Sequence, residues 1–145
     1  MRLLTASLVT LLFLIGNSVH ADSNCKSQYT DFDVCEFSRE LADQMASNLP
    51  MRVNKNMSIE SVNSINHILQ FNAVLDVTRG ELQEIYDKAG MSFEDFRQIM
   101  TNSVDNFCAD GNPVGRLIEL GGVVKYVYKF SDGEQFMEIS KESCA

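Results

Sequence analysis

The sequence predicts an α+β fold, in which helices cover an antiparallel sheet of about four strands that form two hairpins. Segments with apolar residues every three or four positions alternate with segments in which every second residue is apolar. Helix caps and turn signals separate these segments, in the order α-β-β-α-α-α-β-β. With 45% hydrophobic residues and two prolines among 145 residues, the composition is typical of one packed domain.

An export signal precedes this domain. After a basic start, residues 3–15 form an almost unbroken apolar run, and Ala21 closes a small-residue cleavage motif. The run is shorter than the roughly 20 residues of a membrane-spanning helix, although an uncleaved anchor is the alternative. No Leu-x-x-Cys lipoprotein motif follows it, because Cys25 lies beyond a polar gap. We therefore expect a signal peptide over residues 1–21 and a single soluble periplasmic domain over residues 22–145, with no membrane anchor.

The first predicted helix begins at the cap residue Asp33 and runs to about Asn48, with one apolar face. Pro50 ends this helix, because the residue before a proline avoids helical dihedral angles. Two strands follow, over residues 57–66 and 67–77. The second strand alternates more regularly, which places its apolar residues on one face of the sheet.

Three helices are predicted in the middle of the chain. Thr78 begins the first, which runs through Ala89, because a glutamate stands at the capping-box position three residues later. Ser92 begins the second, which runs to about Phe107 after a similar but imperfect box. The inward face of this second helix is expected to comprise Phe93, Phe96, Ile99, Met100, Val104 and Phe107. A short third helix follows from Pro113, since proline suits a first helical turn.

The last predicted element is a hairpin. Four apolar residues alternate with polar ones in its first strand, namely Val124, Tyr126, Tyr128 and Phe130. Asp132-Gly133 is a turn signal, and residues 136–140 form the return strand. The alternation favours a core face, although Tyr126 and Tyr128 could instead stack a ligand. These apolar side chains must be buried, and the hairpin has a strand edge whose backbone groups are unpaired. We therefore expect a homodimer.

The four cysteines, Cys25, Cys35, Cys108 and Cys144, all follow the export signal. An even number in an exported chain is typical of two disulfides, although four cysteines allow three pairings. A zinc site is the alternative, but the sequence has no Cys-x-x-Cys motif and a single histidine beyond the signal. The local pair Cys25–Cys35 would hold the N-terminal tail against the first helix. We expect no metal and no cofactor.

Charge and motifs argue against nucleic-acid binding and against catalysis. The net charge of −8 is unsuited to binding phosphates. His67 has no Gly-x-Ser-x-Gly motif to accompany it, so we interpret it as a strand histidine and not as a catalytic base. Paired carboxylates are the remaining catalytic alternative, but a chain without tryptophan offers a poor platform for sugars. We therefore expect no catalytic residues and no enzyme activity.

Acidic residues gather at two places that we expect to be exposed. The first cluster comprises Glu81, Glu84, Asp87, Glu94 and Asp95, and the second, at the hairpin tip, comprises Asp132 and Glu134. A solvated surface is the simplest interpretation of such clusters. Acidic surfaces also steer basic partners, so these residues are our candidates for a partner-binding surface.

The C-terminal third resembles the ending of pilotins of one type II secretion class. The resemblance rests on Cys108-Ala109-Asp110, a short helix with Leu117, Gly121 or Gly122, a strand with Tyr126 and Tyr128, the turn Asp132-Gly133 and Cys144. Those pilotins also have a first helix that runs into Leu-Pro, as Leu49-Pro50 does here. The resemblance implies a small sheet with helices and a Cys108–Cys144 bridge, which we predict together with Cys25–Cys35. Pilotins of this class are lipoproteins, whereas this signal lacks the lipoprotein cysteine.

The size, acidity, cysteines and export signal also resemble soluble periplasmic immunity proteins of type VI secretion, which neutralise peptidoglycan-degrading effectors. From this resemblance we hypothesise a periplasmic immunity protein that binds and blocks a peptidoglycan hydrolase effector. The alternative is a pilotin-like secretion or assembly factor. Neighbouring genes would distinguish the two, because an effector gene supports the first hypothesis and a secretin operon supports the second.

Overall fold

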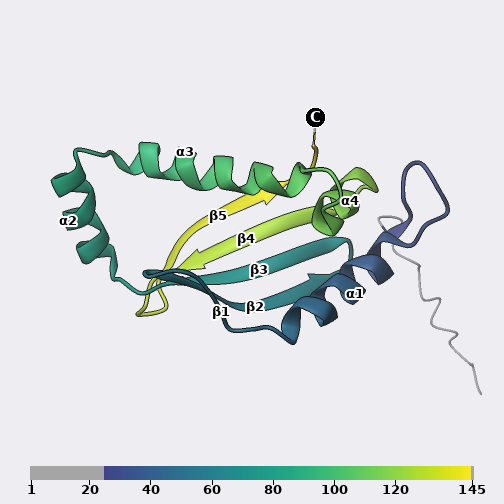
Figure 1. Cartoon of the computed structure of the whole chain (residues 1–145), viewed down its shortest axis with the longest axis horizontal. Helices are drawn as coiled ribbons and strands as arrows, with labels where there is room; N and C mark the ends of the chain where they lie inside the picture. Colours follow the sequence, from purple (N-terminus) through teal and green to yellow (C-terminus); the bar gives the residue numbers. More distant parts are fainter. Residues whose placement is uncertain (1–24, 145) are drawn as a thin grey trace, which may run out of the picture.

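The computed structural model describes residues 25–144, so the predicted signal peptide lies outside the described residues (Figure 1). The helices are α1 (Val34–Ala46), α2 (Arg79–Ala89), α3 (Phe93–Val104) and α4 (Pro113–Glu119), and a 3₁₀ turn, η2 (Asp105–Cys108), follows α3. The strands are β1 (Met51–Asn54), β2 (Met57–Ile65), β3 (Ile68–Leu75), β4 (Val123–Lys129) and β5 (Gln135–Lys141).

The strands form one five-stranded sheet in the order β1-β2-β3-β4-β5. The central strands β3 and β4 run parallel, with Phe71 opposite Tyr126, and the other neighbours are antiparallel. The α+β class is confirmed, but the prediction of about four antiparallel strands in the order α-β-β-α-α-α-β-β is wrong. The helices α2 to α4 carry the chain back to the end of the sheet where β3 begins, and a strand that starts there must run parallel to β3.

The strand missing from the prediction is β1. All its residues are exposed, and it begins at Met51, directly after the cis peptide bond between Leu49 and Pro50. Neither burial nor length therefore distinguishes this segment from a loop. It pairs with β2, where Met51 lies opposite Ile59, so the N-terminal half of the sheet is a three-stranded meander.

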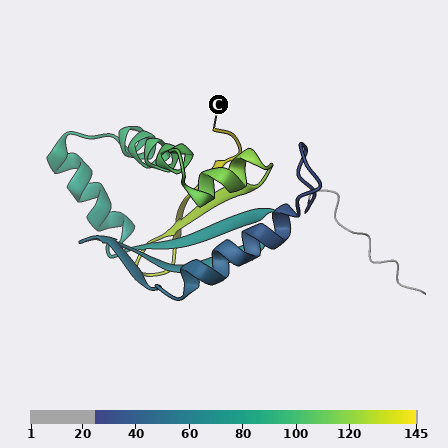
Figure 2. The ribbon, with the colours of Figure 1, turned by 45° about the vertical axis from the view of Figure 1, so that its right-hand side comes forward.

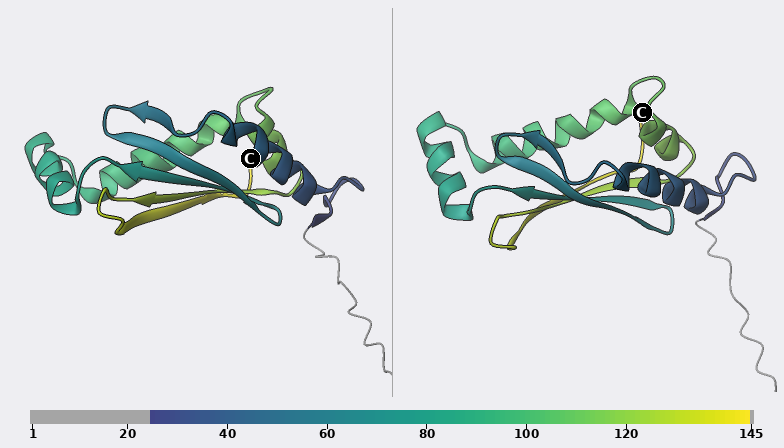
Figure 3. Two further views of the ribbon diagram at one scale, coloured as in Figure 1. Left: turned by 90° about the horizontal axis from the view of Figure 1, so that it is seen from below. Right: turned by 60° about the horizontal axis from the view of Figure 1, so that its bottom comes forward.

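Helices cover one face of the sheet. α1 lies against β2 and β3, while α4 contacts α1, η2 and β4. Figure 2 shows α1, α4 and α3 following one another across the sheet, and both views in Figure 3 place α2 at the end of the molecule away from α1. The covered face carries Leu69, Phe71, Ala73 and Leu75 of β3, all buried, as the alternation in the sequence predicts.

The opposite face of the sheet is polar. Asn72 donates a hydrogen bond to Ser61 Oγ at 2.9 Å, and Lys125 forms an ion pair with Glu138 at 2.7 Å. Cross-strand pairs of this kind stabilise a sheet whose face remains exposed to solvent. The domain therefore has two layers, with helices on one side and solvent on the other.

The predicted caps position the helices. Thr78 and Glu81 exchange hydrogen bonds at the start of α2, and Ser92 and Asp95 do the same at the start of α3. The second box is complete, although aspartate replaces the usual glutamate. Asp33 caps α1 by accepting a backbone hydrogen bond at 2.9 Å. These caps satisfy amide groups that a helix cannot satisfy itself.

The prediction for α3 needs two corrections. The helix ends at Val104 and not at Phe107, because the chain tightens into η2. Phe93 and Ile99 were expected to point inward, but they are 44% and 54% exposed. Phe93 touches Phe136 edge-on, with ring centroids 5.4 Å apart, so it contacts the sheet from its border. Only a narrow stripe of α3 is buried, including Met100 and Val104, because the start of this helix lies against the edge strand β5.

Both predicted disulfides form. Cys25–Cys35 joins the N-terminal segment to α1, and Cys108–Cys144 joins η2 to the segment after β5, with Cα–Cα distances of 4.9 and 5.4 Å. The second bridge closes the C-terminal half of the domain around α4, β4 and β5.

The case for a homodimer is weaker than the sequence suggested. The four apolar residues of the β4 segment are all buried within this chain, namely Val124, Tyr126, Tyr128 and Phe130. They need no second copy to cover them. β5 does form an edge of the sheet, as expected, and the homodimer remains a prediction that rests on this edge alone.

Candidate protein-binding groove

An apolar groove runs over the covered face of the sheet between α1 and α3. It consists of two adjoining hollows of about 240 and 280 Å³. Both hollows are lined by Met51, Ile59, Phe107 and Tyr126. The hollow beside α1 is completed mainly by Met45, Leu49, Val62 and Phe71, and the one beside α3 by Val53, Met57, Val104 and Tyr128. Because they share so many residues, we treat the two hollows as one surface and call it the groove.

Stacked aromatic rings form the floor of the groove. Phe71 and Tyr126 lie face to face with centroids 4.6 Å apart, and Phe107 stacks with them at 6.0 and 5.8 Å. Tyr128 continues the stack, 5.6 Å from Tyr126. Burial raises the pKa of Tyr126 above its usual range and that of Tyr128 to about 12, so both hydroxyls stay neutral. The predicted core role of the tyrosine pair is confirmed, and the same pair lines the groove.

The exposed rim of the groove comes from β1. Met51 and Val53 are each 47% exposed, although both line the groove. Exposed apolar side chains that adjoin a hollow are typical of surfaces that another molecule covers. Methionine adapts its shape to such a partner, because its side chain is unbranched and flexible. The sequence signal for this rim is the short alternation from Met51 to Val53, which is too brief to stand out.

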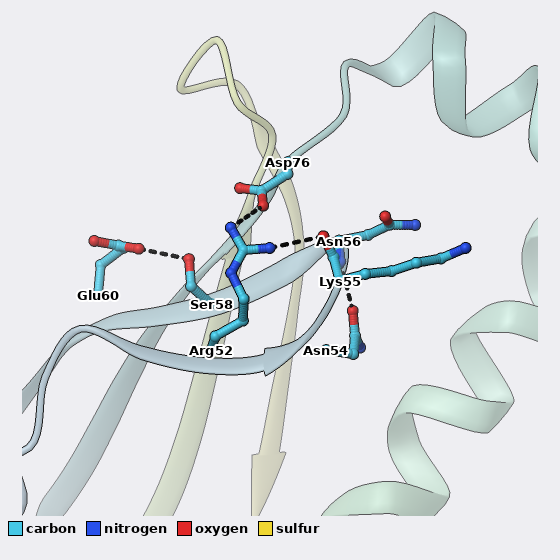
Figure 4. A network of polar contacts seen from close by, with 7 residues as sticks. All are labelled: Arg52, Asn54, Lys55, Asn56, Ser58, Glu60 and Asp76. Carbon is cyan, nitrogen blue, oxygen red and sulfur yellow. Dashed lines mark hydrogen bonds and ion pairs between the residues drawn. The ribbon is translucent and has the colours of Figure 1, made fainter.

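A polar network holds β1 and its turn in place (Figure 4). Arg52 donates to the carbonyl of Lys55 at 2.7 Å and forms an ion pair with Asp76 at 2.8 Å. The backbone amide of Asp76 donates to the carbonyl of Asn56 at 2.8 Å, and Asn54 accepts from the amide of Asn56 at the same distance. These bonds tie the β1–β2 turn to the end of β3, which fixes the rim of the groove.

A second apolar pocket, of about 250 Å³, lies between α2, α3 and the end of β3; we call it the α2 pocket. Its lining includes Leu75, Leu82, Tyr86, Phe96 and Met100, together with Asn54 and Asn56 from the β1–β2 turn. Met57 lines both the α2 pocket and the groove, so the two adjoin.

The predicted acidic clusters lie together at the α2 end of the molecule (Figure 1). Arg79, at the start of α2, donates to Glu134 at 2.8 Å and so joins the α2 region to the hairpin tip. The structure therefore brings the two clusters to one region. None of the seven predicted acidic residues lines the groove or the α2 pocket.

Each acidic residue also has a partner within the chain. The amide and hydroxyl of Thr78 lower the pKa of Glu81, and the hydroxyl and amide of Ser92 lower the pKa of Asp95. The others bond to nearby groups: Glu84 to Lys88, Glu94 to Arg97, Asp87 to Gln83, Asp132 to the amide of Glu134, and Glu134 to Arg79. These roles stabilise helix starts and turns, and a part in partner binding remains a prediction.

A wider hollow, of about 620 Å³, lies at the opposite end, between the N-terminal segment and the chain after β5. His67 lines it with Lys26, Glu119 and Glu142, and within residues 25–144 its Nδ1 atom is buried without a hydrogen bond. The nearest approach to a metal site in this part of the chain is Cys25, Asp33 and Cys35. The two sulfurs there are bonded to each other, so they offer no thiolate ligands.

The sequence matches no protein-family model and no curated protein. Solved structures with a similar fold include EpsS, a pilotin from the Vibrio vulnificus type 2 secretion system (TM-score 0.58, 14% identity, 77% of this chain and 92% of that chain). AspS, the type II secretion pilotin of Vibrio cholerae, matches with a TM-score of 0.55 and 12% identity over 77% of this chain and 89% of that chain. A candidate secreted protein from Pseudomonas aeruginosa matches with a TM-score of 0.58 and 9% identity, over 77% and 93%.

The chain has the fold of these pilotins. At such low identity the likeness concerns the fold alone, and it confirms the small sheet with helices that the pilotin resemblance implied. Between residues 25 and 144, none of the helices has the length and apolar character needed to cross a bilayer.

Proposed function

We propose that this protein is a pilotin-like factor that acts in the periplasm and binds an apolar segment of a secretion-system protein in the groove. The observation that carries the proposal is the groove itself, an open apolar surface rimmed by Met51 and Val53. Its support from outside the chain is the fold shared with EpsS and AspS. An exported chain with two disulfides suits this compartment.

The shape of the groove suits an amphipathic helix. Two adjoining hollows offer places for apolar side chains from successive helical turns, and α1 and α3 provide walls on either side. The floor is aromatic and rigid, whereas the rim carries the adaptable side chain of Met51. Burial of the exposed rim would provide the driving force, at about 25 cal/mol for each Å² of apolar surface removed from water.

We infer that the protein acts by binding and not by catalysis. The groove is lined by no charged side chain within the described residues, and burial keeps its tyrosine hydroxyls neutral. Such a surface offers no general base to activate the hydroxyl of Ser103, which donates to the carbonyl of Met100, but it can hold an apolar partner.

The immunity hypothesis is the weaker of the two. Its candidate contact surface was the acidic clusters, whose residues lie outside the groove and bond to groups of this chain. The pilotin-like alternative uses the groove and agrees with the pilotin folds among the neighbours.

Site-specific photo-crosslinking tests the proposal. A photoreactive phenylalanine analogue replaces Val53 on the rim of the groove in the full chain, which is expressed in its native host. The matched control carries the analogue at Asn63, an exposed position on β2. We expect the Val53 variant to crosslink to an outer-membrane secretin and the Asn63 variant not to. Equal products from both positions would refute binding in the groove, and a cell-wall hydrolase as the product would restore the immunity hypothesis.

A further inference from the structure

Tyr86 buries its ring but leaves its hydroxyl without a hydrogen bond in the described part of the chain. The residue is 3% exposed, and its ring packs against Phe96 with centroids 5.2 Å apart. Burial raises the pKa of this hydroxyl to about 12, so it stays a neutral O–H group that can donate and accept. Buried polar atoms in folded proteins almost always have a partner. Within the described residues this hydroxyl is therefore free to pair with a group of another molecule.

The α2 pocket provides space for that group. Its volume of about 250 Å³ exceeds the about 150 Å³ of a cavity known to hold a benzene ring. It is smaller than the about 300–1,000 Å³ typical of pockets for drug-sized ligands. The space therefore fits one aromatic side chain. Leu75, Leu82 and Met100 give it apolar walls, each less than a tenth exposed.

The turn beside the pocket is fixed. Asn54 and Asn56 are exposed and line the pocket, and a hydrogen bond joins them. The ion pair between Arg52 and Asp76 holds this turn against the end of β3 (Figure 4). A side chain can therefore enter a preformed space, which keeps the entropic cost of binding low.

We propose that the α2 pocket receives one tyrosine side chain of the protein bound in the groove, and that the phenol hydroxyl of this side chain pairs with Tyr86. The proposal rests on the proposed function, since Met57 connects the pocket with the groove. A phenol ring matches the apolar walls, and its hydroxyl matches that of Tyr86, the buried side-chain polar atom without a hydrogen bond among the described residues that line the pocket. An aliphatic side chain leaves Tyr86 without a partner, and a charged side chain loses its hydration among apolar walls.

Two probes of equal size, phenol and toluene, isolate the hydroxyl contact. Both are titrated into the exported protein while the methyl signals of labelled methionines are followed by NMR. Met57, Met91 and Met100 line the pocket and should shift. The measured quantity is the ratio of the two dissociation constants, which cancels the contribution of the ring. We expect Tyr86→Phe to lower the preference for phenol about fivefold, the effect of one neutral hydrogen bond. Tyr29→Phe, at a 79% exposed position, should leave the ratio unchanged.

The outcomes separate the pocket from the function. An unchanged ratio in Tyr86→Phe would overturn the proposal, and so would shifts confined to methionines outside the pocket. Because phenol binding needs no partner protein, it succeeds or fails independently of the crosslink from Val53. If Tyr86→Phe changes the ratio but leaves the yield of a secretin crosslink intact, the pocket does not receive a side chain of that partner and the proposal is wrong. Tyr86→Phe should fold, since it removes an unpaired hydroxyl without changing the ring.

Discussion

Arg79 binds Glu134 through both Nε and Nη2, at 3.1 and 2.8 Å, and so joins the start of α2 to the β4–β5 turn. The same guanidinium lies 5.0 Å from the centre of the Phe130 ring. Hydrogen bonds to the Glu134 carboxylate raise the pKa of the Arg79 guanidinium, so Arg79 remains charged at all ordinary pH values. This is the contact that brings the two acidic clusters of the sequence together.

Removal of this contact should have a small effect. Both side chains are about half exposed, so solvent screens the ion pair and weakens the contact between Arg79 and the Phe130 ring. We expect Arg79→Ala to lower the melting temperature by only a few degrees. A double-mutant cycle with Glu134→Gln measures the ion pair alone. A large coupling between the two positions would contradict the exposed geometry.

The rim of the groove can be tested separately from the fold. Val53→Asp places a charge on a half-exposed residue of β1, so the melting temperature should change by only a few degrees. Binding of an apolar partner should fall at least tenfold, because the charge must lose its hydration in the groove. Co-purification of the crosslinked partner with the tagged protein reports the loss. Asn63→Asp on β2 is the matched control and should retain the partner.

Stability should decline in acid through two helix caps. The pKa of Glu81 lies below its ordinary 4.5 and that of Asp95 below its ordinary 3.8. A carboxyl group whose pKa is lower in the folded than in the unfolded protein stabilises the fold at pH values above its unfolded-state pKa. This stabilisation is lost as the pH falls through its folded-state pKa. We expect thermal stability to fall below about pH 4.5. Thr78→Ala should cost about 1 kcal/mol at pH 7 and make the acid decline shallower, whereas an unchanged slope would exclude Glu81 as a contributor.

The two disulfides should differ in their contribution. Cys108–Cys144 spans 36 positions and Cys25–Cys35 spans 10, so the first restricts the unfolded chain more. Paired serine substitutions should cost about 4 kcal/mol for the long loop and about 3 kcal/mol for the short one. Chemical unfolding of each double variant measures the difference. A larger loss for the short loop would show that the N-terminal segment contributes through its contacts and not through loop length.

Two glycines within helices should respond in opposite ways to alanine. A Cβ at Gly115 would collide with the backbone carbonyl of Phe107, which cannot move without shifting η2. Gly115→Ala should therefore destabilise the domain by about 1–3 kcal/mol. Gly80 in α2 has open space around it, so Gly80→Ala should be neutral or stabilise by up to about 1 kcal/mol. Thermal unfolding of the two variants checks both signs.

Local signals in the sequence were sufficient for the elements that carry them. Thr78, Ser92 and Asp33 mark helix starts because capping chemistry depends on neighbours three residues away. Alternation in β3 identifies the buried face correctly, because side-chain direction in a strand depends on residue parity alone. Both disulfides follow from the number and order of the cysteines together with the pilotin pattern.

These local signals could not predict which distant strands pair with each other. The same alternation in β3 and β4 is compatible with parallel and antiparallel neighbours, so the central pair could not be assigned. β1 is short and fully exposed, and Met51 and Val53 were therefore missed as part of a sheet. The groove combines residues from β1, β3, β4 and η2, and it becomes visible only when the strand order is known. The acidic clusters were chosen as candidates because charged residues can be recognised in a sequence. A groove cannot, because its shape depends on how distant segments pack.

The parallel pairing of β3 with β4 has a consequence for the order in which the chain folds. A polypeptide is made from its N-terminus, so the meander of β1, β2 and β3 emerges while β4 is still to come. Until β4 arrives, the β3 edge exposes unpaired backbone groups in what will become the centre of the sheet. Contacts between segments so far apart also form slowly. Until β4 has formed, the middle strand of the finished sheet is therefore an open edge to which another strand can pair.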